Sequence, residues 1–172
     1  MKEILQYELD ETIVLKSQVF RFKKASEDDF EAVLRLSEKM LEFHKNLDDY
    51  YGIYEKYEDP RDYYSDQLKQ QDKLYIIVYN KDGQPIALSS CYIVFIPDTD
   101  APKIGNMVSN FVCEQYRNFG IGSKLLEYRL DWFRKNNVKF VEMSVDARNE
   151  NALKLWENKG FKQYQIKLKM NL

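Results

Sequence analysis

The chain of 172 residues is predicted to have an α/β (α+β) fold, with a mixed and mostly antiparallel sheet flanked by helices. Residues 74–79 and 85–96 are rich in β-branched and aromatic residues, and the Asn-Lys-Asp-Gly turn between them is typical of an antiparallel hairpin. Residues 107–135 instead indicate a strand, a glycine turn and a helix, a connection that leads to a parallel strand at 138–145. We therefore expect the sheet to be parallel only at this last pair.

Length and composition favour one globular domain. Hydrophobic residues make up 44% of the chain and charged residues 31%, and the formal net charge is −2. This balance supports a packed core and provides no overall basic field, so we expect no nucleic-acid partner. The N-terminus is too charged for a signal peptide and no apolar run is long enough to cross a membrane. We expect a cytoplasmic protein without a membrane partner.

The N-terminal half starts with residues 1–18, whose role the sequence does not decide. Residues 1–18 are interpreted as an N-terminal extension, which is compatible with an added edge strand around residues 13–15, a partner-binding segment or a loose terminus. Residues 19–172 are interpreted as the single main domain. It opens with a strand at residues 19–23, where apolar and polar residues alternate.

Helices are expected at three further places besides the one after the glycine turn. Ser26 followed by Asp29 is a capping pattern, and the apolar stripe from Phe30 towards Phe43 predicts a helix. Another helix is expected from Pro60, and a short one over residues 149–159. Residues 161–170 are expected to return as the final strand of the sheet.

The glycine turn is the first candidate binding site. Gly120 and Gly122 lack the Cβ atoms that would keep a ligand away from the backbone, and Arg117 adds a positive charge. The helix that follows points its unpaired N–H groups and its positive dipole end into the turn, which favours a pyrophosphate. The third glycine of a dinucleotide fingerprint is missing, because Leu125 stands in its place. By itself the pattern is equally compatible with a plain strand-to-helix turn.

Two motifs in the C-terminal half resemble those of the GNAT family of N-acetyltransferases. Arg117-Asn-Phe-Gly-Ile-Gly122 is similar to the family's Arg/Gln-x-x-Gly-x-Gly/Ala turn. The stretch from Asn149 to Phe161 is similar to its Asn-x-x-Ala-x-x-Leu-Tyr-x-x-x-Gly-Phe pattern. The resemblance is strong between residues 107 and 161, and it implies a GNAT fold with a splayed parallel strand pair at the cofactor site.

The resemblance also implies acetyl-CoA as co-substrate, with its pyrophosphate at the glycine turn. Backbone groups of the preceding strand would meet the pantetheine arm and the acetyl carbonyl, and Asn149 would touch the cofactor arm, cap its helix, or do both. The cofactor-binding residues implied in this way are Asn110, Phe111, Val112, Arg117, Asn118, Phe119, Gly120, Ile121, Gly122, Ser123 and Asn149.

The catalytic groups are less well defined by the sequence. The backbone N–H of Val112 is a candidate oxyanion donor. Trp156 stands where many family members have a tyrosine that protonates the departing thiolate, and an indole N–H is no practical acid. Tyr164 is one alternative acid, beside Tyr116 and Tyr128. The base is open, because no carboxylate lies between residues 106 and 112 and the only histidine, His44, is a weak candidate.

The acceptor and the cysteines leave further alternatives open. An acid-rich segment is compatible with a cationic amine acceptor or with an ordinary solvated surface; its members are Asp48, Asp49, Glu55, Glu58, Asp59 and Asp62. Cys91 and Cys113 lie in predicted strands and are expected to be buried, and no metal-binding cluster is visible.

These observations predict an enzyme that transfers an acetyl group from acetyl-CoA to a primary amine by direct attack in a ternary complex. The alternative is a non-catalytic acyl-CoA-binding or sensor module, which the replacement by Trp156 and the missing strand carboxylate would suit. The partners expected are acetyl-CoA and an amine acceptor, with a homodimer as one state that the family resemblance allows.

Overall fold

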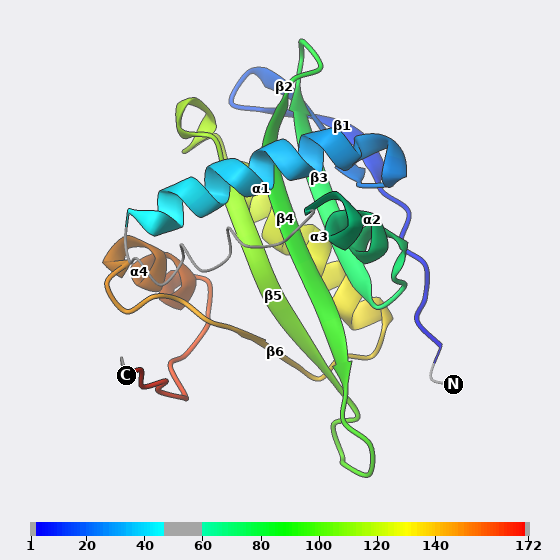
Figure 1. Ribbon diagram of the computed structural model, residues 1–172, viewed down its shortest axis with the longest axis vertical. Helices are drawn as coiled ribbons and strands as arrows, with labels where there is room; N and C mark the ends of the chain where they lie inside the picture. The colour runs from blue at the N-terminus through cyan, green and yellow to red at the C-terminus, as the bar shows by residue number, and fades with distance from the viewer. Residues whose placement is uncertain (1–2, 47–59, 171–172) are drawn as a thin grey trace.

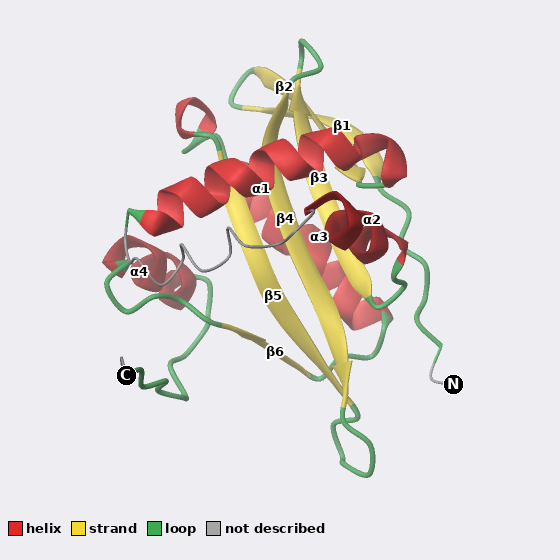
Figure 2. Ribbon diagram, viewed as in Figure 1, coloured by secondary structure: helices red, strands yellow, loops and turns green. Residues whose placement is uncertain are grey.

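The computed structural model describes residues 3–46 and 60–170, and these form one six-stranded sheet with helices on both faces (Figures 1 and 2). In order across the sheet the strands are β1 (Asp10–Leu15), β2 (Gln18–Lys24), β3 (Lys73–Asn80), β4 (Pro85–Phe95), β5 (Lys103–Val112) and β6 (Phe140–Met143). Neighbouring strands are antiparallel except β5 and β6, which run parallel. The predicted mixed, mostly antiparallel sheet is confirmed.

Helices cover both faces of this sheet. The α-helices are α1 (Phe30–Lys45), α2 (Pro60–Lys69), α3 (Ile121–Lys135) and α4 (Glu150–Asn158). In Figure 1, α1 crosses the front of the strands while α3 lies behind them. Val33 and Leu36 of α1 are buried in one apolar cluster with sheet residues, and Leu125 and Trp132 of α3 belong to the cluster on the other face.

The N-terminal segment belongs to the same sheet. β1 pairs with β2 along its whole length, so of the three readings of this segment the edge strand is the one observed. Ahead of β1, Tyr7 is buried and its hydroxyl donates a hydrogen bond of 3.0 Å to Asp131 of α3. Ser26 and Asp29 form the expected capping box, within a short 3-10 turn that leads into α1.

Strand β5 changes register with one neighbour, β4, and separates from the other, β6. Its register with β4 shifts between Ser90 and Cys91, so that Val108 has no partner and forms a bulge. Its pairing with β6 covers only residues 104–107 and ends at the pair Met107 and Met143. Beyond that pair β5 and β6 diverge (Figure 1), and in the described part of the chain no strand pairs with β5 on that side. We call residues 108–112 the open edge of β5.

The predicted final strand at residues 161–170 is wrong. These residues have no regular secondary structure, and the side chains of Tyr164, Ile166, Leu168 and Met170 are exposed. Alternation of apolar residues makes a strand only where a neighbouring edge and an apolar layer are available, and this segment contacts the β6 region through polar side chains instead. The strand predicted at 138–145 is also shorter and spans Phe140–Met143.

One glycine of β5 allows α3 to pack closely on the sheet. A Cβ atom at Gly105 would lie 2.7 Å from the ring of Phe133, which is itself buried. We expect Gly105→Ala to lower the free energy of unfolding by about 1–3 kcal/mol, as overpacking does in a dense core. Chemical denaturation measures this loss. Phe133→Leu in the same chain should recover part of it, and purely additive losses would contradict the proposed clash.

Candidate functional site

The open edge of β5 presents backbone groups on the side away from β4. The N–H of Cys113 donates to Ile86 of β4 over 2.9 Å, and because neighbouring residues of a strand alternate in direction, the N–H and carbonyl of Val112 face the other way. The Arg117 Nε atom indeed donates to the Val112 carbonyl oxygen from that side, over 3.2 Å. The N–H of Val112 is therefore a donor on the open edge.

The glycine turn joins this edge to the N-terminus of α3. Asn118 and Gly120 have positive φ angles of 66° and 94°, the left-handed conformation that favours glycine. The first helical bond of α3 runs from the Lys124 N–H to the Gly120 carbonyl, so the N–H groups of residues 121–123 lack helical acceptors. No side chain caps this end within the described residues, and a Cβ atom at Gly120 would meet nothing within 4 Å. The turn thus has the space and the donors for an anionic group.

Two cations lie at the turn, one of which the sequence did not reveal. Arg117 stacks on the ring of Phe43 of α1 at 5.6 Å, which holds its exposed side chain beside the turn. Lys159, at the end of α4, donates to the Ser123 hydroxyl over 3.0 Å. Its place could not be predicted from the local sequence, because Lys159 and Ser123 are 36 positions apart in the chain. A diphosphate at this turn would meet two positive side chains and the dipole of a 15-residue helix.

The other predicted cofactor residues contribute unequally. Ile121 is buried in the core and Phe119 packs edge-to-face on Phe20, so these two can offer backbone groups but hardly their side chains. Asn149 accepts a hydrogen bond of 3.2 Å from the Ala152 N–H and is the N-cap of α4. The capping alternative for Asn149 is observed, and its contact with a cofactor stays a prediction.

The candidate acids are distributed over the whole molecule. Trp156 is buried, with its ring 5.9 Å from the Arg129 guanidinium carbon and 5.5 Å from the Phe161 ring. The hydroxyl of Tyr128 donates to Glu11 of β1, at the sheet edge opposite β6, and that of Tyr116 accepts from Asn80, the last residue of β3. The hydroxyls of these two tyrosines are engaged with β1 and β3.

Tyr164 marks a carboxylate that the sequence did not single out. Its exposed hydroxyl donates to Glu142 of β6, and this bond raises the pKa of Tyr164 above its usual range. The other oxygen of Glu142 accepts from the Asn106 side chain over 3.1 Å, and Asn106 and Glu142 are paired across β5 and β6. Glu142 thus sits half-buried just before the two strands diverge. In the sequence Glu142 is far from residues 106–112, which lack a carboxylate. Only the parallel register of β5 and β6 places it beside the first of them.

His44 also lies closer to this region than its sequence position suggests. Its ring contacts Phe43, which in turn stacks on Arg117 of the turn. Burial lowers the pKa of His44 below its usual value, against the opposing influence of the Asp146 carboxylate and the Met40 carbonyl. His44 is therefore neutral at physiological pH.

Both cysteines are buried, as predicted. Burial raises the pKa of the Cys91 thiol to about 12. In residues 3–46 and 60–170 no group of three or more His, Cys, Asp or Glu side chains is placed to hold a metal ion. None of the helices in these residues is both long and apolar enough to cross a bilayer.

The acid-rich segment falls mainly on residues 47–59, which lie outside the described residues. Only Asp62 of that segment is described, on the exposed side of α2.

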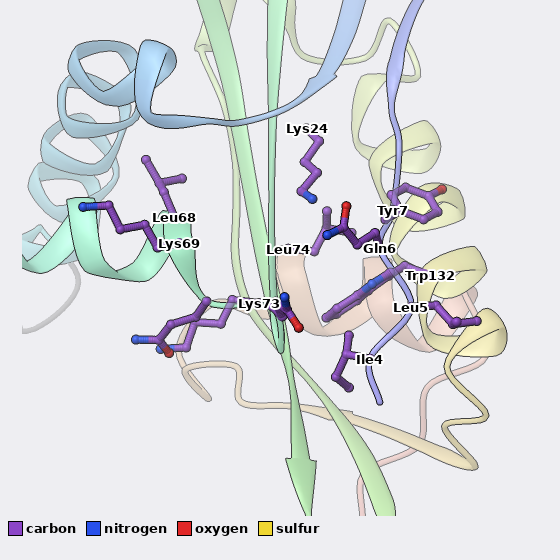
Figure 3. A pocket seen from close by; sticks show the side chains of 12 residues that line it. Ile4, Leu5, Gln6, Tyr7, Lys24, Leu68, Lys69, Lys73, Leu74 and Trp132 are labelled. Atoms are coloured by element: carbon purple, nitrogen blue, oxygen red, sulfur yellow. The ribbon is translucent and has the colours of Figure 1, made fainter. Parts of the chain in front are cut away.

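A separate cavity of about 170 Å³ lies elsewhere in the molecule (Figure 3). It is lined by the N-terminal segment, the end of α2 and the C-terminal half of α3, including Tyr7, Lys24, Lys73 and Trp132. Trp132 is eleven residues along α3 from the glycine turn, roughly 16 Å at the rise of an α-helix. This cavity is no part of the candidate site.

Comparisons with known proteins agree with this arrangement. The model of the acetyltransferase (GNAT) family matches residues 40–161. An uncharacterized N-acetyltransferase of Archaeoglobus fulgidus is 26% identical over 141 residues, which cover 82% of this chain and 92% of that protein. Residues 40–161 are most of the chain, and this match shows its family.

Solved structures show the same fold. A GCN5-related N-acetyltransferase from Ralstonia eutropha superposes with a TM-score of 0.71 at 18% identity, covering 88% of this chain and 98% of that one. An aminoglycoside acetyltransferase from an uncultured soil metagenomic sample, solved with trehalose, gives a TM-score of 0.70 at 13% identity over 89% of this chain and 96% of that one. The predicted GNAT fold and the expectation of an acetyltransferase are confirmed at the level of the family. The splayed parallel pair, the glycine turn and the family match together establish that the chain belongs to the acetyltransferase (GNAT) family.

Proposed function

We propose that the protein transfers an acetyl group from acetyl-CoA to a primary amine by direct attack in a ternary complex. The observation that carries this proposal is the continuity of the open edge of β5 with the uncapped N-terminus of α3. Strand donors for an acyl group and a turn for a diphosphate lie on one stretch of 16 residues, from Val108 to Ser123. Acetyl-CoA carries both groups.

The cofactor is held in this proposal mainly by backbone. The N–H groups of residues 121–123 and the side chains of Arg117 and Lys159 bind the pyrophosphate. Residues 110–112 bind the arm and the acetyl carbonyl, and the N–H of Val112 stabilises the negative charge that develops on the carbonyl oxygen. Each such donor typically contributes a factor of about 10²–10³ to turnover.

Glu142 is the proposed general base. The acceptor ammonium must lose a proton before its nitrogen attacks, and Glu142 lies where β5 and β6 separate. The Asn106 and Tyr164 side chains each donate to one of its oxygens and fix its orientation. The nitrogen–carbon bond then forms and the carbon–sulfur bond breaks. The first ammonium proton stays on Glu142 until solvent removes it, and the second proton, lost from the nitrogen as the amide forms, passes through water towards the departing sulfur.

The departing thiolate needs no strong acid. A thiol with a pKa of about 8.5 leaves as thiolate at neutral pH at a cost of roughly 2 kcal/mol. Water can then protonate it. Trp156 has no acidic proton for this step and is proposed to shape the site by packing. Tyr164 is engaged with Glu142, which leaves it the role of orienting the base.

The proposed acceptor is a chemical class, the primary amines, and no particular compound. Structures of aminoglycoside acetyltransferases share the fold of this chain at 13–18% identity. An N-alpha-acetyltransferase of Sulfurisphaera tokodaii is 35% identical over 65 residues, or 37% of this chain and 39% of that protein. Aminoglycosides and peptide N-termini are therefore the first acceptors to test, followed by polyamines and lysine. Location in the cytoplasm and a homodimeric state stay predictions.

The second candidate function is an acyl-CoA-binding module without turnover. The buried Trp156 and the amide of Asn106, in the strand where several relatives have a carboxylate, favour it. Such a module would have the same acetyl-CoA site as the transferase and would lack only the transfer step.

Thiol release from acetyl-CoA over a panel of amines tests the proposal. Acceptor-dependent release would support the transferase. Calorimetric binding of acetyl-CoA without release for any amine would favour the binding module, and the absence of binding would exclude both.

Replacement of Trp156 distinguishes packing from acid catalysis. We expect Trp156→Phe to keep turnover within about threefold, because the indole has no proton to give, while the lost ring contacts cost about 1 kcal/mol of stability. Initial rates and thermal unfolding measure the two effects. A loss of a hundredfold in kcat with unchanged stability would instead show that the indole acts in the chemistry.

A further inference from the structure

The most unusual group near the site is a fully buried arginine. Arg129 lies on α3, two turns after the glycine turn, and none of its surface is exposed. Within the described residues no carboxylate forms an ion pair with it. Burial lowers the pKa of its guanidinium to about 10, so the side chain still carries its charge at neutral pH. A buried charge without a counter-ion is costly, and its presence therefore calls for a role.

Both terminal nitrogens of Arg129 bond to the open edge of β5. One terminal nitrogen donates to the Ser109 carbonyl over 3.3 Å, and the other donates to the Asn110 Oδ1 atom over 3.0 Å. Nε reaches back to the Leu125 carbonyl of its own helix over 3.4 Å, and the Trp156 ring covers the guanidinium. The cation thus joins α3, α4 and the divergent part of β5.

Arginine determines how the Asn110 amide is turned. A guanidinium has only donors, so the oxygen of the amide must face it and the NH₂ group must face the opposite way. That NH₂ group lies towards the first turn of α3: a Cβ atom at Gly122 would be 3.9 Å from Nδ2. In the described part of the chain Nδ2 donates to no acceptor, and the residue is only half-buried.

From this arrangement we infer that the Asn110 side chain is a binding residue for acyl-CoA and that Arg129 is its positioning residue. The Nδ2 group donates to an acceptor oxygen of the ligand, either a pantetheine carbonyl or a pyrophosphate oxygen. The inference rests on the proposed function, since it needs acyl-CoA at the glycine turn. It adds a side-chain contact to a site that the family resemblance describes through backbone groups.

The first test compares acetyl-CoA binding by calorimetry in Asn110→Asp and Asn110→Ala. Aspartate keeps an oxygen for Arg129 and replaces the donor by a second oxygen, so that it can only repel a ligand oxygen. We expect the dissociation constant for acetyl-CoA to rise at least about tenfold in Asn110→Asp and about threefold in Asn110→Ala. The aspartate effect is larger because aspartate repels the ligand oxygen, whereas alanine only removes the hydrogen bond. Unchanged binding in Asn110→Asp would overturn the inference.

The second test examines the coupling of the two residues. Arg129→Met removes the charge with little change of volume, and we expect it to weaken binding as much as Asn110→Ala does. In the double variant the two effects should not add, because Arg129 acts through Asn110. Arg129→Lys, which keeps a donor, should recover part of the affinity. Additive losses, or an Arg129→Met variant with altered thermal stability and unchanged binding, would show that Arg129 is only structural.

Ligand fragments locate the contact and separate the two hypotheses. If the wild-type protein binds acetyl-CoA and Asn110→Asp weakens its binding of ADP as well, the acceptor is a pyrophosphate oxygen. If ADP binding is unchanged, the acceptor lies on the pantetheine arm. Absence of acetyl-CoA binding by the wild-type protein would overturn the proposed function itself. Wild-type binding that no Asn110 variant alters would overturn this inference alone.

Discussion

Glutamate in place of Gly120 is expected to abolish acetyl-CoA-dependent turnover. The side chain would enter the space beside the N-terminus of α3, where nothing lies within 4 Å of the added Cβ atom, and place a carboxylate against the pyrophosphate. Like charges brought together in a binding site cost several kcal/mol, and about 3 kcal/mol corresponds to roughly a hundredfold weaker binding. Calorimetry with acetyl-CoA and thiol-release rates measure the loss.

The backbone of Gly120 requires a matched control. Its φ of 94° is strained for any residue with a Cβ atom, at a cost of about 1–2 kcal/mol, so that reduced stability alone would also lower activity. Gly83, in the β3–β4 turn, has a φ of 74° and equally open space. We expect Gly83→Glu to lose similar stability and to keep acetyl-CoA binding. Equal loss of binding in both variants would contradict the cofactor role of Gly120.

Glu142→Gln is expected to lower kcat by about 10²–10³-fold, the range typical of a lost general base. Glutamine has the same shape and can still accept from Asn106, so we expect the KM for acetyl-CoA and the thermal stability to change little. The deficit should shrink as the pH approaches the pKa of the acceptor amine, because a neutral amine needs no base. Rate profiles from pH 6 to 10 measure this recovery.

Two variants test competing assignments of the base. Tyr164→Phe removes a partner of Glu142 but no proton acceptor, and should reduce kcat by less than about tenfold. His44→Gln removes the neutral imidazole at the end of α1. If His44→Gln abolished turnover while Glu142→Gln kept it, the base would be His44.

Patterns local in the sequence predicted most of the fold. The β3–β4 hairpin, the capping box before α1, and the strand, turn and helix around Gly120 depend on residues close in the chain, and all are present. Residues 161–170 have the same strand-like alternation and form no strand. The difference lies in whether the apolar side chains find a layer to pack on, which those of residues 164–170 do not, and no local pattern contains that information.

The groups of the candidate site that were missed all depend on long-range placement. Glu142 meets Asn106 only through the parallel register, and Lys159 reaches Ser123 only because α4 ends beside the turn. The bulge at Val108 also breaks the strict alternation of β5. Alternation counted from the buried Met107 would turn Asn110 away from α3, whereas its side chain contacts Arg129 of that helix.

The burial of both cysteines has a practical consequence for every experiment on this protein. Cys91 and Cys113 are 1% and 7% exposed, and the thiolate of Cys91 is disfavoured at any ordinary pH because its pKa is about 12. Alkylating agents and chromogenic disulfides react with accessible thiolates. While the chain stays folded, such reagents will not react with its two cysteines and will detect only the thiol of free CoA. A slow signal without substrate would then register local opening of the sheet.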